Sequence, residues 1–340
     1  MNKTILIPVE NAEITRSDLL RKNLLDGSRK IKLTWLKGKR FLEIPVKPDV
    51  EGYTVIEQDA PEYYGKWQSL KDRLEGIIPS AELEYVPSGW QLIGDVIIIS
   101  ISQEIDSRKT ETAIAKSLLK MYPRCKSVIR DFGIRGQFRE PNRKIIIGDK
   151  VETIHKEHKC LFRMDVTKIM YSKGNLPERK RMSKVGSGEI VVDMFAGIGY
   201  FSIPMGVHAK PEQVIAIELN PVSYGYLCEN IKLNHVGNIV KPINGDCAEV
   251  TPQGVADRVI MGYVGVTHHY LKQGIRAIKK SGGVLHYHET TPESLLFNRP
   301  VSRIRDAARA AGRKVEIMEC RRIKKYSPGV WHVVVDARIQ

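Results

Sequence analysis

The second half of the chain alternates short apolar runs with amphipathic stretches. Apolar runs of strand length occur five times, at residues 189–199, 213–219, 239–246, 256–264 and 283–289. Stretches with helical spacing lie between them, at residues 199–209, 221–235 and 268–283. Because strands that alternate with helices form a parallel sheet with right-handed crossovers, this pattern predicts an α/β domain over residues 166–340. Its tail is expected to add a helix at 302–314 and strands at 315–326 and 331–339.

The first 165 residues predict two smaller α+β units. In residues 1–60, a short amphipathic helix at 13–27 precedes an alternating hairpin at 30–46 with Lys37-Gly38 in its turn. Residues 61–165 show helices, two strands around Gly94-Asp95 and further alternation at their end. Residues 59–68 have the composition of a linker. We therefore expect three domains, with boundaries near residues 60 and 165.

The charge of the chain indicates a polyanionic partner. The chain has 340 residues, a formal net charge of +15 and an isoelectric point near 9.5. Apolar residues make up 42 % of it. A charge this large in an ordinary globular composition favours nucleic acid over an anionic membrane, with a merely solubilising surface as the other explanation. We therefore expect a nucleic acid to be the partner, and the sequence gives no sign of an obligate protein partner.

The cysteines and the apolar runs indicate the cellular compartment of the protein. Five cysteines, an odd number with no CxxC pair, argue against a disulfide framework or a zinc site, so no metal is expected. The N-terminus lacks the apolar run of a signal peptide, and no stretch is long enough to cross a bilayer. The prediction is a cytoplasmic protein without a membrane anchor.

Acidic and glycine residues end three successive predicted strands. The first strand ends in Asp193 and a turn containing Gly197 and Gly199, the second ends in Glu218, and the third in Asp246. The glycines allow a tight turn and a close approach of backbone to ligand, whereas a dinucleotide fingerprint would need a third glycine. Glu218 is placed to accept hydrogen bonds from a ribose. Asp193 is expected to meet an ammonium group, and Asp246 an adenine amino group.

Taken together, these residues are typical of class I S-adenosylmethionine-dependent transferases. Phe195 and Cys247 adjoin the turn and the third strand end, and complete the predicted cofactor set on this side. Ser172 and Arg179, seven residues apart ahead of the sheet, are expected to reach the same ligand, with Arg179 on its carboxylate. A helix cap and a surface arginine are the alternative explanation for that pair.

Two basic groups are candidates for RNA contacts. One comprises Arg135, Arg139 and Arg143, and the other Arg321, Lys324 and Lys325 beside Tyr326. Arginine and lysine bind phosphates, and an adjacent aromatic ring can stack on a base. A solvated surface explains either group about equally well.

The motifs that surround the glycine turn resemble those of the archaeal and eukaryotic tRNA guanine-37 methyltransferase superfamily. The matching stretches are DVTKIMYS, ER, VVDMFAGIGYFSIP, AIELNP, ENIKLN and GD, and the resemblance covers most of residues 90–340. The first segment is similar to that family's small N-terminal domain, which binds the tRNA elbow. The resemblance implies binding of the anticodon stem-loop with S-adenosylmethionine as co-substrate. Lys173 departs from the proline usual after the serine.

The stretch after the fourth strand indicates one branch of that superfamily. The N1-methyltransferases carry Asn-Leu-Pro or Asn-Pro-Pro there, whereas this chain reads Met261-Gly262-Tyr263-Val264. This stretch, together with PGVWHVV further along the chain, resembles the corresponding stretches of the wybutosine-pathway tRNA(Phe) 3-amino-3-carboxypropyltransferases. The resemblance implies transfer of the aminocarboxypropyl group to C7 of 4-demethylwyosine at position 37, with methylthioadenosine released. An N1-methyltransferase, a methyltransferase for wyosine intermediates and a non-catalytic RNA-binding protein are the alternatives.

Three residues are candidates for the chemistry itself. Gly262 is expected to leave room for a tricyclic base, because it lacks the nitrogen-gripping side chain of the methylating branch. Glu178 matches the glutamate proposed as base in that branch. His288 is the alternative that we select, with His286 and His268 also possible, since an imidazole has a suitable pKa for proton transfer.

Overall fold

The computed structural model describes residues 2–63, 68–136 and 139–340, and it divides the chain into two compact units, Met1–Asp72 and Arg73–Gln340. Part of the predicted linker, residues 64–67, lies outside the described residues. The three-domain division remains a prediction, with the first compact unit ending within α2 (Leu70–Leu74) rather than at residue 60.

The first unit is a small α+β body. A four-stranded sheet has the order β2-β3-β1-β4, built from β1 (Lys3–Pro8), β2 (Lys32–Leu36), β3 (Lys39–Pro45) and β4 (Val55–Glu57). The helix α1 (Ala12–Arg21) follows a short turn, η1 (Val9–Asn11), and buries Leu19 against Ile5 and Ile44. The predicted helix and hairpin are both present, whereas strands β1 and β4 were not anticipated.

The second unit begins with a sheet of its own, in the order β5-β6-β7-β8. Its elements are α3 (Ser80–Leu83), β5 (Gln91–Ile93), β6 (Val96–Ile99), α4 (Arg108–Met121), β7 (Ser127–Arg135) and β8 (Glu140–Ile147). Strands β6 and β7 are parallel because α4 connects them, and the other pairs are antiparallel. Ser107 caps the start of α4 with its side chain.

The next hairpin packs against the C-terminal half, residues 166–340. It consists of β9 (Glu152–Glu157) and β10 (Cys160–Asp165), and Phe162 belongs to the same buried cluster as Val191. Asn230 and Asn234 accept from the backbone N–H groups of Arg163 and Leu161 at 2.7 and 2.8 Å. This packing ties the hairpin, which precedes the predicted boundary at residue 165, to the sheet that follows it.

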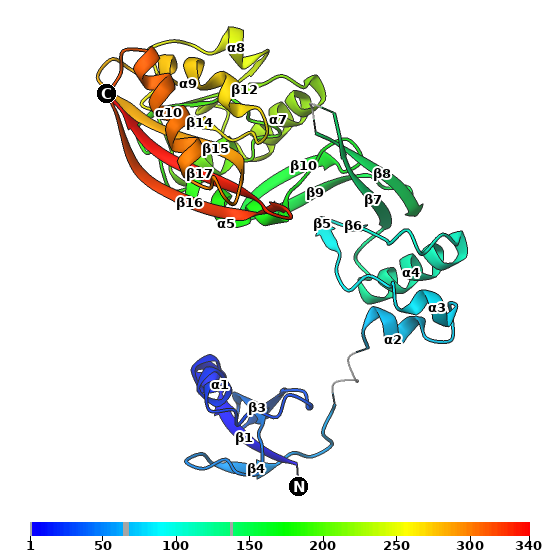
Figure 1. Ribbon diagram of the computed structural model, residues 1–340. Helices are drawn as coiled ribbons and strands as arrows, with labels where there is room; N and C mark the ends of the chain where they lie inside the picture. The colour runs from blue at the N-terminus through cyan, green and yellow to red at the C-terminus, as the bar shows by residue number, and fades with distance from the viewer. Residues whose placement is uncertain (1, 64–67, 137–138) are drawn as a thin grey trace. The chain divides into compact units, whose positions relative to one another are not determined.

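The C-terminal half is built around a seven-stranded sheet with the order β13-β12-β11-β14-β15-β17-β16 (Figure 1). Its strands are β11 (Ile190–Asp193), β12 (Gln213–Glu218), β13 (Val240–Asn244), β14 (Arg258–Met261), β15 (Gly283–Pro292), β16 (Val315–Ser327) and β17 (Val330–Ile339). Its helical segments are η2 (Lys173–Asn175), α5 (Leu176–Met182), α6 (Ser202–His208), α7 (Pro221–Leu233), α8 (Cys247–Val250), η3 (Thr267–Tyr270), α9 (Leu271–Ala277) and α10 (Asn298–Ala310).

The alternating strands and helices confirm the predicted α/β domain, but the sheet is not parallel throughout. Strands β11 to β15 are parallel, whereas β17 runs antiparallel to both β15 and β16. The physical reason is the tight turn at Gly329, because two strands joined by such a turn must be antiparallel. Consecutive side chains of β11 point to opposite faces of the sheet. Val191 packs among residues of α6 and α7, and Val192 packs among residues of α9 and α10.

Candidate functional site

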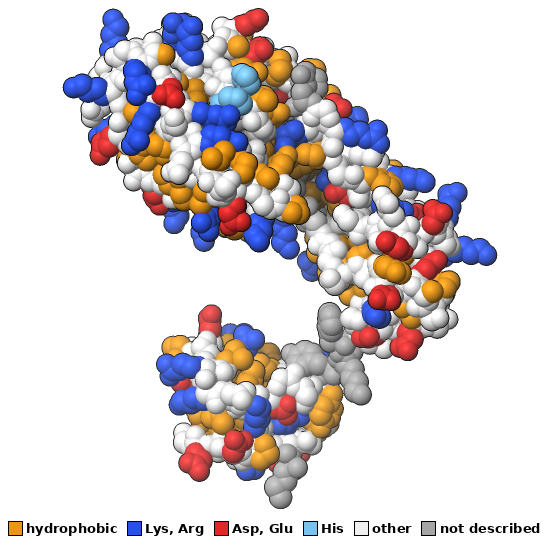
Figure 2. Space-filling model, in the orientation of Figure 1, with side chains coloured by type: hydrophobic (Ala, Val, Ile, Leu, Met, Phe, Trp, Pro, Cys, Tyr) orange, Lys and Arg blue, Asp and Glu red, His pale blue; other side chains and the backbone are white. Residues whose placement is uncertain are grey.

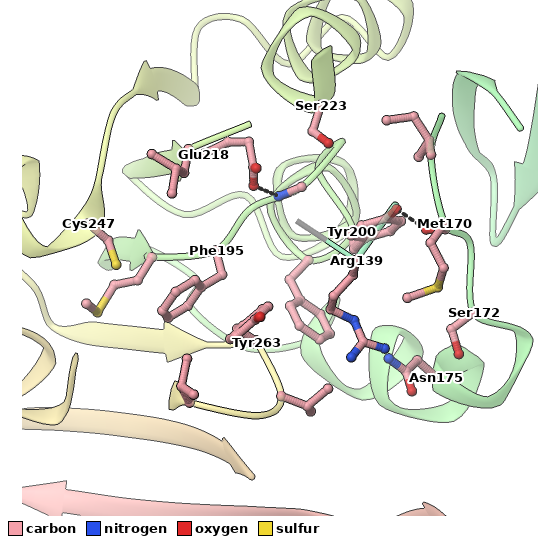
Figure 3. A pocket seen from close by; sticks show the side chains of 18 of the residues that line it. Arg139, Met170, Ser172, Asn175, Phe195, Tyr200, Glu218, Ser223, Cys247 and Tyr263 are labelled. Carbon is pink, nitrogen blue, oxygen red and sulfur yellow. Dashed lines mark hydrogen bonds between the residues drawn. The ribbon is translucent and has the colours of Figure 1, made fainter. Parts of the chain in front are cut away.

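A pocket opens where the parallel strands end, and most of the predicted cofactor residues line it. Figure 3 shows Glu218, Phe195, Cys247 and Tyr263 on one side, with Arg139 and Ser172 on the other. The lining also includes Gly197, Arg179, Asp246, Gly262 and Lys324 from the predicted set. Ligands bind at the carboxyl ends of strands in this fold because the chain leaves the sheet there in loops.

The glycine turn holds the carboxylate of Glu218. The N–H of Gly197 donates to Glu218 Oε2 at 2.7 Å (Figure 3), and the N–H of Asn220 donates to Oε1 at 2.8 Å. Gly197 has a φ of +57°, a conformation that favours glycine. Burial raises the pKa of Glu218, although the N–H donors oppose that effect. Each oxygen retains a lone pair toward the pocket, so the carboxylate suits a diol.

The pocket wall opposite Glu218 is aromatic. Phe195 stacks on Tyr263 with ring centroids 5.4 Å apart, and it meets the edge of Tyr270 at the same separation. Asp246 accepts from the N–H of Ala248 at 2.8 Å through one oxygen, which caps α8, and Cys247 follows it into the pocket lining. The arrangement offers flat apolar surface and one carboxylate oxygen, which suits an adenine ring.

Asp193 and Gly199 lie beneath the pocket rather than in its wall. Asp193 is fully buried, and it accepts from Ser202 Oγ at 2.6 Å and from the N–H of Phe195 at 3.4 Å. Burial raises the pKa of Asp193 to about 6. The expected contact between Asp193 and an ammonium group is therefore not supported, because its oxygens hold the turn instead. Gly199, with φ +98°, packs against Ile203 and shapes the same turn.

Arg179 lines the pocket, but its charge is already paired. Its Nε and Nη2 donate to the two carboxylate oxygens of Glu157 at 2.7 and 2.6 Å, and Nη1 donates to the carbonyl of Ser172. The side chain is 2 % exposed. The expected role of Arg179 on a ligand carboxylate is therefore weakened, and its contacts instead fix the loop that carries Ser172.

Lys324, predicted for RNA, reaches this part of the pocket instead. Its Nζ donates to Ser172 Oγ at 2.6 Å, and burial is the first cause of its lowered pKa, followed by the nearby charges of Arg139 and Arg179. Arg139 donates to the hydroxyl of Tyr326 at 3.0 Å at the same pocket. Within the described parts of the chain, neither Lys324 nor Arg139 forms an ion pair with an acidic side chain, so both charges face the pocket.

Gly262 lines the pocket, but the space beside it is not empty. A β-carbon built at this position would lie 2.6 Å from Cε2 of Phe201. The ring of Phe201 in turn packs against His288, with centroids 5.5 Å apart. The expectation that Gly262 leaves room for a base is therefore corrected in part, since the freed volume beside its α-carbon admits the ring of Phe201.

Glu178 and His288 do not reach the pocket wall. Both oxygens of Glu178 are held by Arg181, at 2.9 and 2.6 Å, and the side chain is buried. His288 is fully buried, and burial lowers its pKa to about 3. Direct proton transfer from substrate to either residue is thus not supported. His332, which sequence reasoning missed, lines the pocket in front of His288.

Of the remaining residues predicted to contact RNA, some are exposed and others are held in ion pairs. Arg135 is exposed at the end of β7, and Lys325 is exposed above the ring of Trp331 at 5.8 Å. Arg321 pairs with Glu319. Arg143 is 4 % exposed and pairs with Asp131 at 3.2 Å, so a phosphate contact by Arg143 is not supported. Lys and Arg side chains are spread over the visible face of the second unit rather than gathered in one patch (Figure 2).

The aromatic and histidine residues of the wall were the main omissions of the sequence analysis. Tyr200 donates to the carbonyl of Met170 beside the glycine turn (Figure 3), and Tyr326 and His332 come from the C-terminal hairpin. Tyr326 was named only as the neighbour of a basic group, and the stretch PGVWHVV, which contains His332, was the signal that could have drawn attention to that histidine. In the described residues, no helix has the length and apolarity needed to span a membrane.

Three family models match most of the chain. The TRM5/TYW2 methyltransferase domain matches residues 153–318, the TYW2 N-terminal domain matches 70–151, and the tRNA methyltransferase 5 N-terminal domain matches 4–54. A relative from Methanocaldococcus jannaschii, named tRNA(Phe) (4-demethylwyosine(37)-C(7)) aminocarboxypropyltransferase, is 47 % identical over 253 residues, which are 74 % of this chain and 98 % of the relative. The chain belongs to the TRM5/TYW2 family.

Two solved structures of the TRM5/TYW2 family frame the comparison. Trm5b from Pyrococcus abyssi is 34 % identical and covers 100 % of both chains with a TM-score of 0.74. TYW2 from Pyrococcus horikoshii, in complex with MeSAdo, is 35 % identical and covers 79 % of this chain and 97 % of its own, with a TM-score of 0.70. These relatives confirm the predicted class I S-adenosylmethionine-dependent fold, preceded by N-terminal α+β segments.

Proposed function

We propose that this protein transfers the 3-amino-3-carboxypropyl group of S-adenosylmethionine to C7 of 4-demethylwyosine at position 37 of tRNA(Phe), releasing methylthioadenosine. The observation that carries this proposal is the 47 % identity to a nearly full-length relative of that name. A TYW2 relative that binds MeSAdo, the nucleoside left after such a transfer, supports it. Met261-Gly262-Tyr263-Val264, in place of an Asn-Pro-Pro-type motif, agrees with the same branch.

The residues of the pocket fit S-adenosylmethionine. Glu218 would accept from the ribose hydroxyls, and Phe195, Asp246 and Cys247 would enclose the adenine. When bound, the co-substrate supplies an electrophilic carbon beside its sulfonium. Which carbon reacts depends on which one lies in line with the nucleophile, so the residues that hold the amino-acid tail decide the outcome.

Lys324 and Ser172 are the proposed partners of the tail carboxylate. Lys324 lies in the pocket with no acidic partner among the described residues, whereas Arg179 is already paired with Glu157. A charge-assisted bond from Lys324 would draw the tail toward the C-terminal hairpin, where His332 and Tyr326 also line the pocket. The tail would then face the incoming base rather than a closed recess.

The identity of the small product tests the proposal. The protein would be incubated with S-adenosylmethionine and tRNA(Phe) that carries the tricyclic intermediate, and both products would be weighed by mass spectrometry. We expect methylthioadenosine together with a tRNA heavier by one aminocarboxypropyl group. Adenosylhomocysteine with a tRNA heavier by one methyl group would overturn the proposal.

A guanine-37 N1-methyltransferase is the second candidate. It is favoured by the 34 % identity to a Trm5b over the entire chain, which includes the N-terminal segment matched by the tRNA methyltransferase 5 domain. The same assay, run with tRNA that carries unmodified guanine at position 37, separates the two candidates by the nucleoside released.

Contacts with the anticodon stem-loop and the elbow of the tRNA are part of the proposal. Arg135 is exposed, whereas Arg143 is buried, so the pair offers a matched test. R135Q should lower the salt dependence of tRNA binding by about one unit of slope, as expected for the loss of one phosphate contact. R143Q should instead lower the thermal midpoint and leave the slope unchanged. An unchanged slope in R135Q would remove Arg135 from the interface.

The proposed location is the cytoplasm, where tRNA is available and a reducing environment keeps thiols free. All five cysteines are free in the structure, in agreement with that location. We retain three domains as a working division, with the N-terminal segment proposed to contact the tRNA elbow.

A further inference from the structure

A row of ionisable side chains lies buried on one face of the sheet behind the pocket. Strand register places His286 opposite Asp336, His288 opposite Val334 and Thr290 opposite His332, so these side chains share a face. His286, His288 and His332 are each at most 2 % exposed. Apolar residues would ordinarily fill such positions, and a buried polar chain at a site is a recognised mark of function.

The chain runs from the pocket wall inward. His332 lines the pocket, and its Nε2 lies 3.0 Å from Nδ1 of His288. His288 Nε2 has no hydrogen-bond partner within the described residues and faces Glu178 Oε1 at 3.7 Å. Glu178 is held by Arg181, whose Nη1 also donates to Asp336 at 2.7 Å.

The charges fix where the imidazole protons lie. Glu178, an ionised partner of Arg181, attracts a proton to the nearer nitrogen of His288, Nε2. His288 Nδ1 then accepts, and His332 Nε2 must donate to it. The remaining nitrogen of His332, Nδ1, carries the free lone pair.

We infer that His332 is the catalytic base of the transfer, with His288 and Glu178 as positioning residues that set its tautomer. This inference rests on the proposed function. C7 of the base donates its π electrons to the electrophilic methylene carbon, the carbon–sulfur bond breaks, and its electron pair leaves on the thioether. The cationic base then loses its C7 proton to His332 Nδ1, and the C–H electron pair restores the ring. The arrangement of a base oriented by a second and a third group is the general logic of catalytic triads.

The strength of the base agrees with this step. Burial, followed by the electrostatic interactions with His288 and with the charge of Lys324, lowers the pKa of His332 to about 2. His332 is therefore neutral and able to accept a proton at any physiological pH, although weakly. A weak base suffices because the cationic adduct is itself a strong acid that regains its ring conjugation on losing the proton.

The decisive experiment uses H332N and tRNA(Phe) whose 4-demethylwyosine carries deuterium at C7. H332N should lower the single-turnover rate by about 10²-fold or more. A primary isotope effect should appear in H332N and be absent or small in the wild type, because proton loss becomes rate-limiting. Imidazole in solution should restore part of the rate to H332A. H235N, an exposed histidine at the end of α7, is the matched control and should change neither rate nor isotope effect.

A measurement independent of turnover tests the tautomer. ¹⁵N spectra of histidine-labelled free protein should show His332 protonated at Nε2 and bare at Nδ1, and H288Q should alter that pattern while lowering kcat with little change in KM. Wild-type rate in H332N would overturn the inference, as would a slow H332N with neither isotope effect nor rescue. Failure of the proposed function is recognised separately, by adenosylhomocysteine from the wild-type protein.

Discussion

The two halves of the pocket are built in different ways. The nucleoside half uses strand ends that follow one another in the chain, with Glu218 held by backbone N–H groups of Gly197 and Asn220. The other half collects Lys324, His332 and Arg139 from two hairpins that are nearly 190 residues apart in sequence, as the bond from Arg139 to Tyr326 illustrates. The difference shows that backbone groups fix the nucleoside half, whereas side chains from distant segments form the other half. We call this second part the transfer half, because we propose that it selects the transferred group.

The sharpest test of the nucleoside half is E218A. It removes the expected ribose acceptor and should weaken S-adenosylmethionine and methylthioadenosine alike, by about 3 kcal/mol or roughly a hundredfold in Kd. Isothermal titration calorimetry with both ligands measures the effect. E249Q, an exposed acid on α8, is the control. A large loss for one ligand only would break the comparison, because both share the ribose.

The complementary test of the transfer half is K324Q. S-adenosylmethionine carries the carboxylate that Lys324 is proposed to bind, and methylthioadenosine does not. K324Q should therefore weaken the first ligand by about 2 kcal/mol and leave the second unchanged, since a charge-assisted hydrogen bond contributes that amount. K325Q, which alters the exposed neighbour, should affect neither Kd. Equal losses for both ligands in K324Q would contradict the assignment.

Gly262 lines the same pocket, and G262N tests how closely the side chains around it pack. The new side chain would displace Phe201, whose ring packs on His288, so both stability and transfer should fall. Overpacking of this kind costs about 1–3 kcal/mol. Thermal unfolding and single-turnover rates measure the two effects. The double variant G262N/F201L should regain stability; if G262N alone behaved as the wild type, the contact with Phe201 would be of no consequence.

The buried histidines give the transfer half a pH dependence of stability that is opposite in sign to that of the nucleoside half, where burial raises the pKa values of Asp193 and Glu218. Burial lowers the pKa of His288 to about 3 and of His332 to about 2, below the ordinary value near 6.5. The unfolded chain therefore binds more protons below pH 6.5, and stability should fall by at most about 1.4 kcal/mol per pH unit for each histidine. Thermal midpoints from pH 7.5 to 4.5 would show this. H332N should flatten the decline, whereas H235N should not; an equal decline in both would exclude His332 as its source.

Local sequence signals were enough to predict most elements of the fold and most of the residues that line the nucleoside half of the pocket. Asp193, Gly197, Glu218 and Asp246 stand at strand ends that hydrophobic periodicity alone locates, and parallel topology brings such ends to one edge. The sequence did not reveal that Asp193 would turn inward to Ser202, because the direction of a strand-end carboxylate depends on the helix that follows it.

Tertiary structure alone decided which basic side chains form ion pairs within the protein and which stay free to bind a ligand. Arg179, Arg143 and Lys324 look alike along the chain, yet Glu157 pairs with the first, Asp131 with the second, and no acidic side chain of the described residues pairs with the third. Strand register, a non-local property, placed His332 beside Lys324 and on the face that His288 shares. The sequence by itself therefore determined, through short-range patterns, the fold class and most residues of the proposed nucleoside half. The arrangement of Lys324 and His332 in the transfer half was decided by contacts between segments far apart in the chain, which no local pattern encodes.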